Sequence, residues 1–95
     1  MTKAYFSEEG FRKHIRVEGH AATPTKCAAV STLLYTLAGY LHNIPCRIEK
    51  EKLDEGDAEL IFRGMRREVK FAYDLTLIGF LQLEKTFPDE FKIIF

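Results

Sequence analysis

Residues 3–18 alternate between apolar and polar positions, which predicts a β-hairpin. Strand-forming residues fill 3–6 and 11–18, and the Ser-Glu-Glu-Gly segment between them has the composition of a turn. In the second run, alternation places one set of side chains toward a core, namely Phe11, Ile15 and Val17. The opposite face is predicted to be solvated and carries Arg12, His14, Arg16 and Glu18.

A helix is predicted over residues 24–42, followed by a second hairpin. The Asn-Ile-Pro sequence is expected to end this helix. Its apolar residues recur at helical spacing and are Val30, Leu33, Leu34, Leu37, Ala38 and Leu41. Thr23 can cap this helix with Pro24 at its first position, or Thr25 can cap it instead. Residues 46–53 and 58–64 are predicted strands across the turn Asp-Glu-Gly-Asp.

A second helix is predicted over residues 65–86, with a short last strand after Pro88. One apolar stripe contains Val69, Tyr73, Leu77, Phe80, Leu81 and Phe87, whereas Phe71, Leu75 and Ile78 lie off it. A helix that is apolar on more than one side indicates a partner, so we expect a homodimer. The order ββαββα(β) predicts an α+β fold, with one mixed or antiparallel sheet carrying two helices in a single domain over residues 1–95.

Composition narrows the possible partners. The chain has 95 residues, 46% of them hydrophobic, and its 14 basic residues are balanced by 14 acidic ones. Without a net positive field we expect no direct contact with nucleic acid or a membrane, and expect protein, peptide or small-molecule partners. There is no apolar run of about 18 residues and no signal-like start, so a cytoplasmic location is expected.

Cysteine usage gives no sign of a disulfide framework or a metal site. The two cysteines, Cys27 and Cys46, lie in segments of different predicted structure, and a reducing compartment keeps them as thiols. Two cysteines in unrelated contexts do not form a zinc site, and we expect no metal or other cofactor.

Candidate chemistry lies at His20 and Cys27. Gly19 lets the chain turn as the second strand ends, so His20 is expected at a sheet edge. Cys27 follows the helix start closely, where unpaired N–H groups, the helix dipole and the neighbouring Lys26 favour a thiolate. Cys27 would then be a nucleophile and His20 its base and later its acid, with the free N–H groups stabilising an oxyanion.

The spacing of His20 and Cys27 also fits a simpler interpretation. Cysteine is among the most buried residue types, and a histidine followed by a cysteine seven residues later is not a motif. Cys27 is then a core thiol beside an incidental histidine. Ser31, one helical turn after Cys27, would bond to a carbonyl or orient a site.

Two motifs resemble the ribosomal-processing cysteine protease family, Prp. They are Val-Glu-Gly-His-Ala at residues 17–21 and Cys-Ala-Ala-Val-Ser at 27–31, and the resemblance extends over nearly the whole chain. It implies an α+β homodimer that removes a short N-terminal extension from a large-subunit ribosomal protein, cutting after a pair of phenylalanines. By this resemblance His20 is the base and Cys27 the nucleophile, with Gly19, Ala28 and Ser31 supporting the site or its oxyanion environment.

One segment departs from the family. Prp proteins usually have a longer loop between the histidine and the cysteine, with an aspartate three residues before the cysteine. Here the link is Ala-Ala-Thr-Pro-Thr-Lys, and Pro24 stands at the aspartate's place. A prophage relative that processes a capsid or scaffold protein, or an interaction module without catalysis, therefore remains an alternative.

Overall fold

The computed structural model describes residues 1–21 and 23–95. Seven elements follow in the predicted order. The strands are β1 (Thr2–Glu9), β2 (Arg12–Glu18), β3 (Arg47–Asp54), β4 (Asp57–Arg63) and β5 (Phe91–Ile94), and the helices are α1 (Pro24–Leu41) and α2 (Arg67–Thr86).

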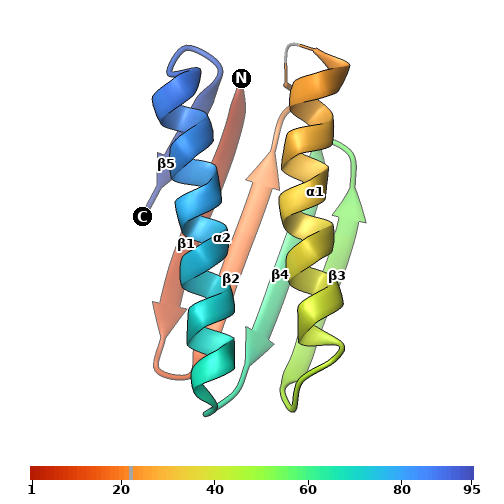
Figure 1. Ribbon diagram of the computed structural model, residues 1–95, viewed down its shortest axis with the longest axis vertical. Helices are drawn as coiled ribbons and strands as arrows, with labels where there is room; N and C mark the ends of the chain where they lie inside the picture. The colour runs from red at the N-terminus through yellow and green to blue at the C-terminus, as the bar shows by residue number, and fades with distance from the viewer. Residues whose placement is uncertain (22) are drawn as a thin grey trace.

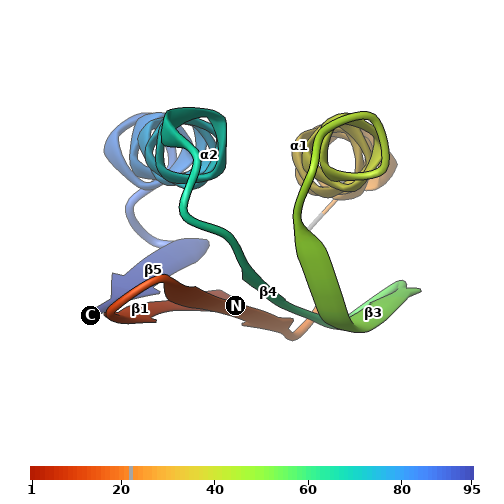
Figure 2. The ribbon, with the colours of Figure 1, turned by 90° about the horizontal axis from the view of Figure 1, so that it is seen from below.

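The strands form one mixed sheet in the order β3-β4-β2-β1-β5. Neighbours are antiparallel except β1 and β5, which are parallel (Figure 1). Both helices pack side by side on one face of the sheet and leave the other face uncovered (Figure 2). The predicted α+β fold with two helices on one sheet is therefore confirmed, and the sheet is mixed.

The core lies between the helices and the covered face of the sheet. Phe6 pairs with Ile15, and Ile15 pairs with Leu60, so their side chains point toward the same face. All three are at most 2% exposed. The helices approach closely at Gly79, because a Cβ there would lie 2.6 Å from a methyl carbon of Leu33. Helix packing at this point therefore depends on glycine.

The first hairpin differs from the prediction at its turn. Strand β1 continues through the expected turn residues to Glu9, and the chain reverses at Gly10, where φ is +59°. Phe11 consequently lies in the turn and is 58% exposed, so its predicted core position is wrong. Lys13 takes the inward position at 4% exposure, since its amine bends back to donate to the carbonyl oxygen of Gly10 (3.0 Å).

The second helix also starts later than predicted. It begins at Arg67, and Met65 is exposed in the preceding connection. The side chains predicted off the main stripe are exposed on this helix, as expected for Phe71, Leu75 and Ile78. Among the described residues, no helix is both long and apolar enough to cross a membrane.

Candidate functional site

Cys27 is positioned by the first turn of α1. Thr23, one of the two caps that the sequence allowed, is the N-cap, and its hydroxyl oxygen accepts a hydrogen bond from the Lys26 amide (3.3 Å). The Cys27 amide donates to the carbonyl oxygen of Thr23 (3.0 Å). Pro24, at the first helical position, fits the helix start because it has no N–H to satisfy. The half-buried Cys27 thiol therefore sits on a rigid, capped helix end.

His20 is positioned by two close backbone approaches. Gly19 has φ of +89°, and a Cβ at this position would lie 2.2 Å from the carbonyl oxygen of Met1. Its amide donates to the carbonyl oxygen of Gly56 (3.0 Å), which ties the end of β2 to the β3–β4 turn. The His20 ring packs against Gly56, where a Cβ would lie 2.6 Å from ring atoms Cε1 and Nε2. Glycine is therefore required at both positions.

A small cavity of about 30 Å³ brings the predicted residues together. It is lined by Gly19, His20, Cys27 and Ser31. Ala28 is exposed on α1 and does not line it. Within the described part of the chain, the Cys27 thiol donates to the carbonyl oxygen of Ala21 (3.7 Å), and no hydrogen bond joins it to His20. The structure thus places thiol and imidazole around one cavity without pairing them.

The first turn of α1 has few free backbone N–H groups that could stabilise an oxyanion. The Lys26 and Cys27 amides are already bonded to Thr23, and Pro24 has no amide hydrogen. Thr2 lines the same cavity, and its buried hydroxyl has no hydrogen-bond partner among residues 1–21 and 23–95. An unsatisfied buried hydroxyl is unfavourable, so Thr2 is a polar group without a partner beside this cavity in the described part of the chain.

Lys26 does not direct its charge toward Cys27 as the sequence suggested. Its ammonium pairs with the Glu90 carboxylate (2.5 Å) and lies 4.2 Å from the centre of the Phe87 ring. These contacts join the start of α1 to the segment after α2. Lys26 therefore ties the start of α1 to the segment between α2 and β5.

The β3–β4 turn is a part of the site that sequence reasoning missed. Asp54, Glu55, Gly56 and Asp57 all line the cavity beside His20. The sequence indicated only a solvated turn, because nothing local shows that this turn touches the end of β2. The Asp57 carboxylate in this turn pairs with Lys52 (2.6 Å) and Arg16 (3.3 Å).

Cys46 has a different environment from Cys27. It packs against the core after α1, and its thiol donates to the carbonyl oxygen of Leu41 (3.3 Å). Burial raises the pKa of this thiol above 9.0. Cys46 thus packs as a small, partly buried residue at the edge of the core. In the described residues, no group of three His, Cys, Asp or Glu side chains is arranged to hold a metal ion.

Solved structures share this fold over nearly the full chain. The ribosomal processing protease Prp from S. aureus, in complex with a covalently linked product peptide, superposes with a TM-score of 0.83 at 13% identity, covering 99% of this chain and 98% of that one. Prp from S. aureus in complex with a substrate peptide gives a TM-score of 0.73 at 12% identity, covering 98% and 97%.

A third similar structure is a hypothetical protein from Staphylococcus aureus, with a TM-score of 0.77, 11% identity, and coverage of 99% and 98%. No protein-family model and no curated protein matches the sequence. At these identities the likeness establishes the fold. The fold expected from the two sequence motifs is thus the fold observed.

Proposed function

We propose that this chain is a cysteine endopeptidase in which Cys27 is the nucleophile and His20 the general base and acid. The observation that carries the proposal is the single cavity lined by both residues, formed where α1 begins and β2 ends. The S. aureus Prp structures of the same fold contain a substrate peptide or a covalently linked product peptide. A peptide is therefore the substrate class we assign.

The reaction follows from the groups around the cavity. His20 accepts the thiol proton as Cys27 Sγ attacks the scissile carbonyl carbon, and a tetrahedral oxyanion forms. The C–N bond then breaks, His20 gives its proton to the leaving amine, and a thioester remains on Cys27. Water, deprotonated by His20, hydrolyses the thioester and restores the thiol. Hydrogen bonds between catalytic groups commonly tighten only when substrate binds, which fits the unpaired thiol and imidazole here.

Oxyanion stabilisation would come from the cavity rather than from the helix start alone. A volume of about 30 Å³ holds roughly one water molecule, or one carbonyl oxygen of a substrate. Thr2 lines this volume and its buried hydroxyl has no protein partner in the described residues, and Ser31 lines the volume from α1. We assign these groups to the polar environment of the reacting carbonyl, with Gly19 shaping the backbone beside it.

The proposed substrate is the N-terminal extension of a large-subunit ribosomal protein, cut after aromatic residues in the cytoplasm. The cavity is too small for a phenyl ring, so the ring would pack on its apolar rim. Tyr35, on α1 two turns after Cys27, and Leu53, on β3, line that rim. Processing of a phage capsid or scaffold protein would use the same rim and differ only in the peptide.

The exposed face of α2 supports the proposed homodimer. Phe71 and Leu75 line a groove of about 350 Å³ between the helices, together with Tyr40 of α1. Such a contiguous apolar surface favours association. Leu75→Glu would place a charge in the interface, and sedimentation at micromolar concentration should then show a monomer where the parent is a dimer. A monomeric parent would contradict the proposal.

Replacement of the nucleophile tests the proposed function. Cys27→Ala should abolish cleavage of a peptide containing two consecutive phenylalanines, with a loss of at least about 1,000-fold, since no other group supplies the nucleophile. Cys46→Ala is the matched control and should retain turnover. Mass spectrometry should also detect a thioester on the parent and none on Cys27→Ala. Unchanged turnover in Cys27→Ala, or no cleavage by the parent, would favour the interaction module without catalysis.

A further inference from the structure

Three arginines form one row across the uncovered face of the sheet. Arg63 of β4 pairs in register with Arg12 of β2 on one side and with Arg47 of β3 on the other. Paired residues in neighbouring strands point to the same face, and the adjacent Lys13 and Phe62 point into the core. The three guanidinium groups are therefore presented together on the open face.

Like charges in register destabilise a sheet, and this row is only partly neutralised. Strand β3 has a register irregularity between residues 48 and 50, and Glu49 lies within it. Its carboxylate accepts from Arg12 Nε (2.9 Å) and lies 3.5 Å from Arg63 Nε. In the part of the chain that the structure describes, Arg47 forms no ion pair. The Glu49 carboxylate thus pairs with two of the three arginines.

Further arginines lie near the arginine row, at the same end of the molecule. Arg66 and Arg67 follow directly at the start of α2, so five of the chain's six arginines lie at this end. Three carboxylates, Glu9, Glu49 and Glu68, lie near these five arginines in the fold, so the eight residues together carry a net charge of plus two. The net charge of the whole chain is zero, so it does not reveal this local excess of positive charge.

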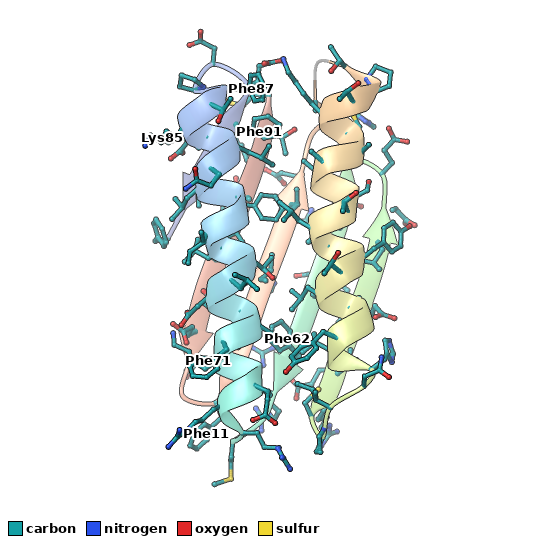
Figure 3. The ribbon with its side chains drawn as sticks, viewed as in Figure 1. Phe11, Phe62, Phe71, Lys85, Phe87 and Phe91 are labelled. Atoms are coloured by element: carbon teal, nitrogen blue, oxygen red, sulfur yellow. The ribbon has the colours of Figure 1, made fainter. Side chains whose placement is uncertain are left out.

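Exposed apolar side chains lie beside the arginine row. A groove of about 390 Å³ is lined by Phe11, Met65, Arg12 and Arg63, with Glu9 and Gly64. Phe11 is 58% exposed and Met65 79% exposed. Phe11 lies at the end of the molecule opposite Phe87 and Phe91 (Figure 3), and the Phe87 ring contacts Lys26 at the start of α1. The arginine groove is thus separated from the Cys27 cavity along the 36 Å long axis.

We infer that this arginine groove, lined by Arg12, Arg63, Phe11 and Met65 and continued by Arg47 at the next position of the arginine row, binds single-stranded nucleic acid. Guanidinium groups match phosphate oxygens in fork geometry, and neighbouring strands space the arginines by about 5 Å, in line along a backbone. Phe11 offers an exposed ring on which a base can stack, which an acidic peptide would not use. The inference does not depend on the proposed peptidase activity.

Binding of a labelled oligouridylate of about twelve nucleotides tests the inference. Fluorescence anisotropy at about 50 mM salt should show micromolar binding that weakens with salt, with a slope near −2 for three phosphate contacts. Arg47→Gln should weaken binding several-fold and bring the slope closer to zero by about 0.7. Phe11→Ala should weaken binding about tenfold at an unchanged slope.

Lys85→Gln is the matched control, because it removes one positive charge at the other end of the molecule (Figure 3). It should leave binding unchanged, and all variants should melt like the parent because the altered side chains are exposed. No binding at low salt, or an equal loss in Lys85→Gln, would overturn the inference. A poly-glutamate peptide that binds as tightly, with no effect of Phe11→Ala, would assign the groove to acidic peptides and overturn it as well.

Discussion

The two ends of the molecule are both closed by hairpin turns that need glycine, yet the turns serve different purposes. Gly56 in the β3–β4 turn has φ of +77°, and its missing side chain leaves room for the His20 ring. Gly10 in the β1–β2 turn has φ of +59°, and a Cβ there would meet nothing within 4 Å. Both turns need a residue with positive φ. Only the β3–β4 turn contacts a candidate catalytic residue, His20.

The largest expected effect comes from adding a methyl group to each turn. Gly56→Ala and Gly10→Ala should each lose about 1–2 kcal/mol of stability, because a left-handed backbone is unfavourable with a Cβ. Only Gly56→Ala also displaces His20, so its kcat should fall about 100-fold, as expected for a catalytic group moved by about 1 Å. Peptide cleavage and thermal melting of both variants measure the two effects separately.

Gly10→Ala serves as the control for backbone strain. If it lowers kcat as much as Gly56→Ala does, the loss reflects general destabilisation. Full activity in Gly56→Ala would show that the ring position against Gly56 does not matter to catalysis. Either result would remove the distinction between the two turns.

A smaller effect should separate the two cysteines, which also lie toward opposite ends. Burial raises the pKa of Cys46, and its thiol donates to the Leu41 carbonyl oxygen. Cys27 lies at a helix start beside the cavity. Iodoacetamide at neutral pH should therefore modify Cys27 at least about tenfold faster than Cys46, as followed by peptide mass mapping. Equal rates would indicate that Cys27 is an ordinary core thiol.

The smallest expected effect concerns Glu49 in the arginine row. Its hydrogen bond from Arg12, together with Arg63 and Arg47 nearby, lowers the pKa of its carboxyl below 4.5. A lowered folded pKa stabilises the protein above pH 4.5, and this contribution is lost as the pH falls through the folded pKa. Glu49→Gln should melt slightly below the parent at pH 7, and the two should converge in acid.

Glu49→Gln also sharpens the inference about the arginine groove. Removing the carboxylate leaves Arg12 and Arg63 without their shared partner, so this variant should bind oligouridylate several-fold more tightly than the parent does. Peptide cleavage at the other end should not change. Weaker oligonucleotide binding by this variant would show that Glu49 orients the arginines rather than competing with the ligand.

The sequence alone determined the elements because their signals are local. Thr23 and Pro24 act within one turn of α1, and alternation along β2 identified Ile15 and Val17 as core residues. The first turn was misplaced because Glu8 and Glu9 have turn-like composition, yet they extend β1, and only Gly10 supplies the positive φ. Composition indicated a turn, whereas the backbone conformation fixed its position.

Only the tertiary structure decided which distant residues meet. Strand β2 pairs with β4, so His20 reaches Gly56, and Arg12 aligns with Arg63 and Arg47. The sequence located His20 and Cys27 individually, but their shared cavity depends on how α1 lies over the sheet. The physical reason is that strand pairing and helix packing are set by the core as a whole, since burying one face fixes register over long separations that no local pattern encodes.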